Sequence, residues 1–267
     1  MTVQVDAYLE KFRAFGEAPS LERYMALFHP GATLFDAGME RPLTVPEIPD
    51  NIRPILAALP DFHFEIRHWR LRDDTLFVEA ANHATVGGEP LRWDSVYCMT
   101  LEGDQVIRGR RYYDRAPLLR RLQPDLPPAP AYDPVEEDVP EPRARRPVER
   151  WVEDYTALWQ KPDPQRFAGF YAHDGVILNP GMERPIARRE IPGYYRFLLG
   201  VVPDLTMQRM SWAGDDERLL IEWRGEGHVA GRPLVLPVVD RWCLKDGLAT
   251  EGVARFDSLT VLQALAG

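Results

Sequence analysis

The chain has 267 residues, of which 45% are hydrophobic and 27% charged, and its net charge is −9. This acidity argues against a general nucleic-acid binder and against adhesion to anionic lipid. No uncharged apolar stretch is long enough to cross a membrane, and the first residues do not resemble a secretion signal, so we expect a cytoplasmic protein.

Metal and cofactor motifs are also missing from the pattern. Two cysteines, Cys98 and Cys243, are too few for a disulfide framework or a cysteine metal cage. Six histidines are scattered without the spacing of metal ligands, and no glycine-rich phosphate loop or nucleophile elbow is found. We therefore expect no metal and no cofactor.

The first sixty residues predict three helices and one strand. Apolar residues recur at helical spacing in Tyr8 to Phe15, Tyr24 to Phe28 and Ile48 to Leu59. Between the second and third of these segments, Ala32 to Phe35 reads as a strand. It ends at the turn Gly38-Met39-Glu40-Arg41-Pro42, because glycine interrupts a strand and proline restricts the backbone after it.

Four further strands come after the third helix. Each segment alternates or is rich in β-branched and aromatic residues, and short polar turns such as GGEP and EGDQ separate them. The four segments are FHFEIRHWRL, TLFVEAANHAT, PLRWDSVYCMTL and QVIRGRRYYD. Helices followed by a strand meander predict an α+β unit with helices on one face of a curved antiparallel sheet.

The pentapeptide GMERP occurs at 38–42 and again at 181–185, which is a shift of 143 positions (181 − 38). The same shift, without a gap, superimposes Trp69 on Trp212 and Asp114 on Asp257. The chain is therefore read as a tandem duplication, and two copies are too few for a solenoid. The repeated turn suggests a geometric task, with Glu40 and Arg41 pinning the turn or a contact between the copies.

Composition divides the chain into three parts: copy 1 at 1–123, a linker at 124–147 and copy 2 at 148–267. Proline and acidic residues dominate the linker, which we expect to be semi-rigid and to lie on the surface. The sharper alternative is that the linker is a binding segment. Copy 2 opens with an amphipathic helix over Trp151 to Trp159 and repeats the element order of copy 1.

Several short motifs carry a family resemblance. They are the strand ends Asp36-Ala37-Gly38 and Asn179-Pro180-Gly181, the Pro-Asp turns, the run PVVDRW and the run YYDRAPLL. In this order they resemble the SnoaL-like branch of the NTF2-like superfamily. The resemblance implies two tandem cones of curved sheet, each closed by three helices over an apolar pocket. Because such domains commonly pair through their sheets, it also implies an intramolecular pseudo-dimer, with further homo-oligomerisation open.

The superfamily includes ketosteroid isomerases, polyketide cyclases, limonene-type epoxide hydrolases and non-catalytic binding or assembly modules. Its isomerases use a carboxylate base at the end of the first strand, with a tyrosine of the first helix and a protonated aspartate of a late strand holding the oxyanion. The resemblance places the base at Asp36 in copy 1 and at Asn179 in copy 2. The tyrosine and late-strand positions hold Phe12 and Tyr97 in copy 1, and Tyr155 and Asp240 in copy 2.

Strand alternation extends the candidate list, because every second side chain faces the same way. We expect these additional side chains to point inward: His83, Trp93 and Arg111 in copy 1, and Arg224, Glu226 and Trp242 in copy 2. His83 is a candidate base near neutral pH, and Arg111 is a candidate anchor for an anion. Arg224 and Glu226 resemble half of the epoxide-hydrolase arrangement.

Each candidate also has a structural explanation. Asp36 precedes a glycine turn, where aspartate often bonds local backbone, and Arg111 would then only neutralise it. Asp240 interrupts an apolar strand, so its charge needs protonation, a hydrogen bond or an ion pair with Arg224. Tyr155 is explained equally by core packing with a satisfied hydroxyl.

The sequence favours a cofactor-independent enzyme that moves protons on an apolar, oxygenated ring compound of polyketide or terpenoid type, as an isomerase or cyclase does. A carboxylate or His83 would transfer the proton, while Tyr155 and Asp240 stabilise the enolate. One alternative is a non-catalytic ligand-binding or assembly protein, and a further one is an epoxide hydrolase. Which copy is active, and on which substrate, is left open.

Overall fold

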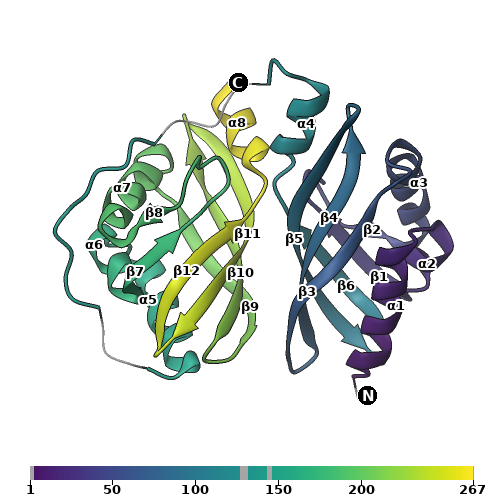
Figure 1. Cartoon of the computed structure of the whole chain (residues 1–267), viewed down its shortest axis with the longest axis horizontal. Coiled ribbons are helices and arrows are strands. Elements are labelled where there is room, and N and C mark those ends of the chain that lie inside the picture. The colour runs from purple at the N-terminus through teal and green to yellow at the C-terminus, as the bar shows by residue number, and fades with distance from the viewer. Residues whose placement is uncertain (1–2, 127–131, 143–145, 267) are drawn as a thin grey trace. The chain divides into compact units, whose positions relative to one another are not determined.

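The computed structural model describes residues 3–126, 132–142 and 146–266. The chain divides into two compact units, Met1–Leu126 and Pro127–Gly267 (Figure 1). The first unit contains copy 1. The second contains copy 2 together with residues 132–142 of the linker. Both units are α+β domains, as the sequence predicts.

Copy 1 is built on a six-stranded sheet, and its first three α-helices lie on one side of the sheet (Figure 1). Its helices are α1 (Val5–Glu17), α2 (Leu21–Met25), η1 (Val45–Glu47), α3 (Ile48–Ala58) and α4 (Ala116–Leu122). Its strands are β1 (Phe28–Asp36), β2 (Leu43–Thr44), β3 (His63–Arg72), β4 (Thr75–Val86), β5 (Glu89–Glu102) and β6 (Gln105–Tyr112). The order across the sheet is β2-β1-β6-β5-β4-β3.

Copy 2 repeats this architecture with the order β8-β7-β12-β11-β10-β9. Its helices are α5 (Val148–Gln160), α6 (Pro164–Phe167), η2 (Ala168–Phe170), η3 (Arg188–Glu190), α7 (Ile191–Val201) and α8 (Ser258–Ala266). Its strands are β7 (Tyr171–Ile177), β8 (Ile186–Ala187), β9 (Thr206–Gly214), β10 (Arg218–Val229), β11 (Arg232–Lys245) and β12 (Leu248–Arg255). Identical strand orders confirm the tandem duplication.

Two details of the expected architecture are wrong. Each sheet is mixed rather than antiparallel, because β1 pairs parallel with β6 and β7 pairs parallel with β12. The second helix of copy 1 ends at Met25, and Phe28 already belongs to β1, where it pairs with Val106 of β6. Phe28 is buried, so its helical spacing to Tyr24 reflects the shared core and not a continuous helix.

The first helix of each copy buries the face that its spacing predicts. In α1, the residues Tyr8, Phe12 and Phe15 are buried in one core with the inner face of the sheet. In α5, the residues Trp151 and Tyr155 occupy the same places in the second core. The aromatic rings thus join helix and sheet in each copy.

The GMERP turns are held by the same contacts in both copies. Gly38 has φ +83° and Gly181 has φ +84°, which is the left-handed region that favours glycine. Arg41 donates to Glu47 of η1 at 2.6 Å, and Arg184 donates to Glu190 of η3 at 2.7 Å. The arginine therefore pins the turn to the following helix.

The methionine of each turn also has a structural contact. The backbone N–H of Asp36 points to the sulfur of Met39 at 3.2 Å, and that of Asn179 to the sulfur of Met182 at 3.3 Å. Glu40 is exposed, and nothing in the structure gives it a role in the turn. GMERP is thus a device that fixes the rim of each cone beside position 36 or 179.

No helix in the described part of the chain is long and apolar enough to cross a membrane.

Candidate functional site

The inner face of the copy 1 sheet carries three of the four strand residues expected there. Trp93 and Tyr97 lie in the core with α1, and Arg111 lines a cavity of this copy. These positions alternate along β5 and β6 as strand geometry requires. The expected inward direction is therefore confirmed for Trp93, Tyr97 and Arg111.

The expectation for His83 is wrong. In β4, Ala80 and Ala84 belong to the core, and an uninterrupted register with β5 places His83 on the opposite face. The His83 ring stacks on His63 of β3, with centroids 5.0 Å apart, and burial lowers its pKa. Asn82, and not His83, takes the inward place.

The expectations for Arg224 and Glu226 are wrong for the same reason. Ile221 and Trp223 of β10 lie in the core of copy 2, so the even-numbered positions face outward. Arg224 and Glu226 are exposed and pair with each other at 2.6 Å. Arg224 is thus not the partner of Asp240, and the half-motif of an epoxide hydrolase is on the outer face.

The negative charge of Asp36 in copy 1 is balanced by an ion pair with Arg111. It ends β1, and its register partner in β6 is Arg111. Arg111 Nε donates to Asp36 Oδ1 at 3.0 Å, and its Nη2 donates to Oδ2 in a second bond. The backbone N–H of Ala37 also donates to Oδ1, at 2.8 Å. Both structural explanations of Asp36 are therefore observed. Its carboxylate accepts a hydrogen bond from local backbone and forms an ion pair with Arg111.

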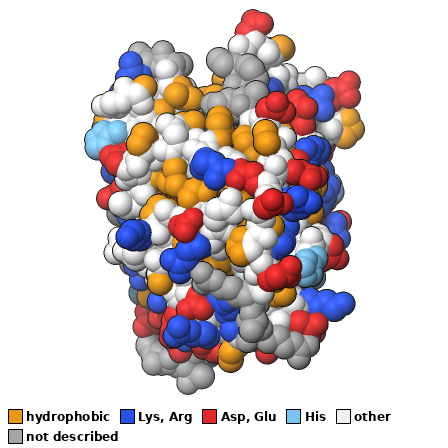
Figure 2. All heavy atoms as spheres, turned by 90° about the vertical axis from the view of Figure 1, so that its left-hand side faces the viewer, with side chains coloured by type: hydrophobic (Ala, Val, Ile, Leu, Met, Phe, Trp, Pro, Cys, Tyr) orange, Lys and Arg blue, Asp and Glu red, His pale blue; other side chains and the backbone are white. Residues whose placement is uncertain are grey.

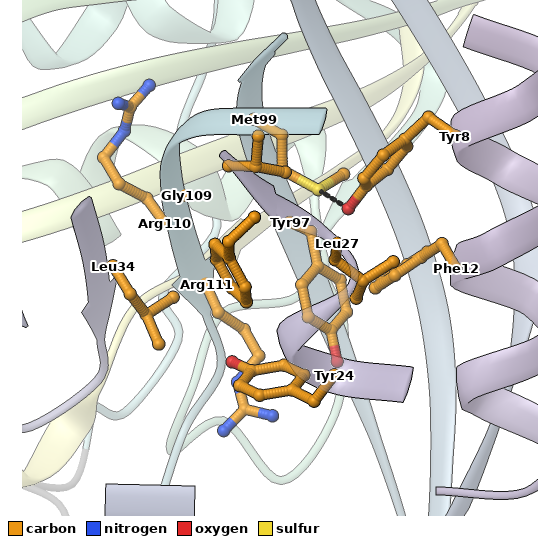
Figure 3. A pocket seen from close by; sticks show the side chains of 12 residues that line it. Tyr8, Phe12, Tyr24, Leu27, Leu34, Tyr97, Met99, Gly109, Arg110 and Arg111 are labelled. Atoms are coloured by element: carbon orange, nitrogen blue, oxygen red, sulfur yellow. Dashed lines mark hydrogen bonds between the residues drawn. The ribbon is translucent and has the colours of Figure 1, made fainter. Parts of the chain in front are cut away.

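A small cavity lies beside this ion pair (Figure 3). Its volume is about 20 Å³, which holds about one water molecule and no ring compound. Tyr24 of α2, Tyr97 of β5 and Arg111 of β6 converge on it from three elements. The Tyr8 hydroxyl donates to the Met99 sulfur at 2.7 Å on its far side.

Tyr24 of this cavity and Tyr113, which contacts Arg111, keep their hydroxyl protons near neutral pH. The Arg111 guanidinium lies 4.7 Å from the ring centre of Tyr113 and 5.8 Å from that of Tyr97, in cation–π geometry. Burial raises the pKa of Tyr113 to about 12 and raises the pKa of Tyr24 further. In the interior of copy 1, the charges of Asp36 and Arg111 therefore balance each other.

A second polar group in copy 1 was missed by the sequence reasoning. Asn82 is completely buried, and its Nδ2 donates to Ser95 Oγ at 2.8 Å and to the Trp93 carbonyl at 3.1 Å. Alternation with Ala80 and Ala84 would have placed Asn82 inward, had the strand been counted from its alanines. The group links β4 and β5 on the inner face.

The acid of copy 2 is in a different situation. Asp240 lies on β11 between Val238 and Trp242, which both belong to the core, and it is half-buried. Burial raises its pKa to about 7, while the Trp223 indole acts in the opposite direction. Its register partner in β12 is Ala254, so no guanidinium stands where copy 1 has Arg111.

Four tyrosines surround this carboxyl. Burial raises the pKa of each hydroxyl, and the Asp240 charge raises each further. They are Tyr155 of α5, Tyr171 of β7, and Tyr194 and Tyr195 of α7. Tyr155 and Tyr195 share a hydrogen bond of 3.0 Å between their hydroxyls. All four are protonated near neutral pH, and each therefore brings a hydroxyl proton to the interior.

Asn179 orients one of these hydroxyls. The backbone N–H of Ala254 donates to Asn179 Oδ1 at 2.9 Å, which fixes the amide orientation. Asn179 Nδ2 then donates to the Tyr194 hydroxyl at 2.9 Å. Because the Tyr194 oxygen accepts this bond, its own proton is available to another acceptor. Asn179, which occupies the place of the catalytic base in the family's isomerases, therefore orients the Tyr194 hydroxyl as a hydrogen-bond donor.

The core of copy 2 next to Asp240 is aromatic. Trp242 points inward, as expected, and its ring lies 4.8 Å from Trp151 and 5.0 Å from Tyr155. The indole N–H of Trp151 is buried without a hydrogen-bond partner in the part of the chain that the structure describes. This core is apolar and contains a few hydrogen-bond donors.

No cluster of three or more potential metal ligands occurs among the described residues.

A model of the SnoaL-like domain matches the chain twice, over residues 5–109 and 152–252. The chain belongs to the SnoaL-like domain family. Both matches fall on the repeated units, and Asp36 and Asp240 each lie inside one of them.

Solved structures with a related fold resemble one SnoaL-like copy at a time. An NTF2-like protein from Burkholderia pseudomallei is 15% identical over 45% of this chain and 97% of its own, with a TM-score of 0.41. A protein with a ketosteroid isomerase-like fold from Catenulispora acidiphila, bound to trimethylamine, is 17% identical over 43% and 92%, with a TM-score of 0.40. IdmH from Streptomyces antibioticus, named as a candidate polyketide cyclase, is 18% identical over 45% and 98%, with a TM-score of 0.39. No curated protein matched the sequence.

Proposed function

We propose that copy 2 is a proton-transfer catalyst in which Asp240 is the acid–base group. The observation that carries this proposal is an inward carboxyl with a pKa of about 7 and no cation at the position of Arg111. A group whose pKa lies near the working pH is both available as a base and able to return the proton. In copy 1 the corresponding acid is neutralised.

Each residue of the copy 2 interior has its own part in this reaction. Asp240 as carboxylate takes a proton from the carbon next to a substrate carbonyl, so that the C–H bond breaks and an enolate forms. The Tyr194 hydroxyl, oriented by Asn179, donates to the enolate oxygen, with the Tyr155–Tyr195 pair as a second source of hydroxyl protons. Asp240 then returns the proton to the same or another carbon, which gives exchange or isomerisation.

This assignment differs from the one that the family resemblance implied. There, the late-strand acid holds the oxyanion and the first-strand acid is the base. Here the first-strand position is Asn179, whose amide cannot accept a proton at neutral pH, and His83 faces outward in the other copy. Asp240 is left as the inward group of copy 2 that titrates near neutrality.

The residues around Asp240 indicate the substrate class. Trp151, Trp223 and Trp242 form a flat aromatic part of the core, and the polar groups are concentrated at Asp240 and Tyr194. Such a lining suits an apolar ring compound with a ketone oxygen, of polyketide or terpenoid type. The carboxyl takes and returns the proton, and the hydroxyls hold the oxygen.

A non-catalytic role is the second candidate, and it is favoured for copy 1. The Asp36 carboxylate is held in an ion pair with Arg111, and the adjacent cavity has room for about one water. We therefore propose copy 1 as a scaffold or binding module. The position of Arg224 and Glu226 on the outer face argues against epoxide hydrolysis.

The test is deuterium exchange measured by NMR with a panel of cyclic ketones in deuterated water. We expect the wild-type protein to exchange an α-proton of at least one ketone, and Asp240→Asn to be slower by about 100- to 10,000-fold. Asp36→Asn is the matched control in copy 1 and should keep most of the rate. Equal rates for Asp240→Asn and wild type would refute the assignment of Asp240.

A further inference from the structure

Residues 132–142 of the linker lie against copy 2, and we call this segment the strap (Figure 1). Tyr132 packs its ring edge-on against Tyr194, with centroids 5.6 Å apart and planes at 76°, and also against Phe197 at 5.5 Å. Its hydroxyl donates to the Glu190 carbonyl at 3.0 Å. The first residues of the strap thus reach a tyrosine of the candidate site.

The helix beneath Tyr132 is shaped for this contact. A Cβ on Gly193 of α7 would lie 2.6 Å from the Tyr132 hydroxyl oxygen, which is closer than real side chains approach. At the equivalent place, 143 residues earlier, copy 1 has Asp50. The contact therefore depends on a glycine that only copy 2 carries at this position.

Charge holds the middle of the strap. Glu137 forms an ion pair with Arg196 and accepts a hydrogen bond from Gln165 at 2.9 Å. The backbone N–H of Glu137 donates to the Arg189 carbonyl at 2.9 Å, and Arg189 pairs with Asp138 at 3.2 Å. Figure 2 shows acidic and basic side chains interspersed over this face.

The receiving surface is specific to copy 2. Arg188 donates to the Pro140 carbonyl, and Arg188 and Arg189 together contact four residues of the strap. The equivalent residues in copy 1 are Val45 and Pro46, whose side chains offer neither charge nor a donor. The duplicated surfaces have therefore diverged where the strap lies.

We propose that the strap forms the outer wall of the copy 2 site and that Tyr132 is a positioning residue for Tyr194. This inference rests on the proposed function, in which Tyr194 donates to the substrate oxygen. Tyr194 is held from inside by Asn179 and from outside by Tyr132, and it is 8% exposed. Removing Tyr132 frees one side of the ring, and the hydroxyl loses its fixed direction.

The first experiment needs no substrate. One side-chain amide hydrogen of Asn179 is donated to the Tyr194 hydroxyl, so its exchange with solvent, measured by NMR, reports whether that hydroxyl is in place. We expect Tyr132→Ala to accelerate this exchange about tenfold. Tyr132→Phe keeps the ring contacts and loses only the bond to Glu190, so it should stay close to wild type. Equal exchange in Tyr132→Ala and wild type would overturn the proposal.

The second experiment reverses the charges of the ion pair between Glu137 and Arg196. Glu137→Arg and Arg196→Glu should each make the strap cleavable by protease and accelerate Asn179 exchange, and the double variant should restore both. A double variant that behaves like the sum of the single ones would show that the strap is held by something else, and would overturn the role of this pair.

The two proposals fail in different ways. If no ketone exchanges in the wild-type protein while Tyr132→Ala still accelerates Asn179 exchange, the positioning stands and the chemistry falls. If ketone exchange is present, Tyr132→Ala should lower kcat more than it changes KM, and Tyr132→Phe should rescue kcat. A change confined to KM would contradict a positioning role for Tyr132.

Discussion

Copy 1 and copy 2 share a strand register but distribute charge differently within it. Tyr97 faces Arg111 across β5 and β6, and Asp240 faces Ala254 at the equivalent pair of β11 and β12. Copy 1 has its acid at the end of the first strand, with a guanidinium bound to it. Copy 2 has its acid on the late strand with no such partner. One interior is charge-compensated, and the other keeps a group that can exchange a proton.

The hydroxyls have been redistributed as well. Copy 1 uses Tyr8, Tyr24, Tyr97 and Tyr113, and copy 2 uses Tyr155, Tyr171, Tyr194 and Tyr195; none of these pairs up under the shift of 143. The turns that frame the two cones, in contrast, keep identical residues and identical contacts. The frame and the interior have therefore changed independently, because the frame sets backbone geometry and the interior only has to remain filled and hydrogen-bonded.

The largest effect is expected when copy 2 receives an arginine at the position equivalent to Arg111 of copy 1. Ala254→Arg places a guanidinium opposite Asp240, and we expect the pKa of Asp240 to fall from about 7 to about 4, a change of about 4 kcal/mol in the relative free energies of its two protonation states. Carbon-13 NMR of labelled aspartate measures this directly. Ala254→Met brings a similar bulk without charge, and a fall of the same size in that variant would contradict the electrostatic explanation.

The second prediction removes the cation of copy 1. Arg111→Met leaves the Asp36 carboxylate largely buried without its partner, and we expect the free energy of unfolding of copy 1 to fall by about 3 kcal/mol. Denaturant unfolding measures this change. The double variant Asp36→Asn with Arg111→Met removes both charges and should recover most of the loss. If the double variant is as unstable as the single one, packing and not charge is responsible.

The third prediction concerns pH. The pKa of Asp240 is higher in the folded protein, about 7, than in the unfolded chain, where aspartate titrates near 4. Between these values the folded state binds more protons, so the contribution of Asp240 to stability is lost as pH rises, at up to about 1.4 kcal/mol per pH unit. Unfolding of wild type and Asp240→Asn across this range should differ in slope. Parallel curves would mean that Asp240 titrates normally.

The smallest effect distinguishes the two GMERP turns. Arg184→Ala should lower the melting temperature more than Arg41→Ala, because the side chain of Glu190 is 8% exposed and that of Glu47 is 38% exposed. Losing a partner costs more for a buried carboxylate than for a solvated one. Thermal unfolding of the two single variants is sufficient, and the reverse order would contradict this account.

The fold could be predicted because its evidence is distributed along the whole chain. The shift of 143 aligned residues from Gly38 to Asp114 with their counterparts, and the helical spacing in α1 and α5 marked the faces that are buried. The parallel pairing of β1 with β6 could not be predicted from periodicity, since alternation along a strand carries no information about the direction of its neighbour.

The arrangement of the candidate site was predicted only in part. The family resemblance proposed Asp240, Tyr155 and Asn179 as candidates, and strand alternation correctly predicted that Trp242 points inward. The residues placed on the wrong face were His83, Arg224 and Glu226, because a displacement of one residue along a strand reverses the direction of every side chain. Tyr194 and Tyr132 were missed, since their contact joins a helix to a linker and obeys no spacing rule.

The position of the strap decides how the chain can be divided into halves. A cut at the compositional boundary, after residue 147, would leave the strap on the wrong half, and copy 2 would lose Tyr132 and Glu137 together. A cut between Leu126 and Pro127 keeps every described contact between the strap and copy 2 within one fragment. By its contacts, the strap therefore belongs with copy 2 in the unit Pro127–Gly267, although composition assigns it to the linker.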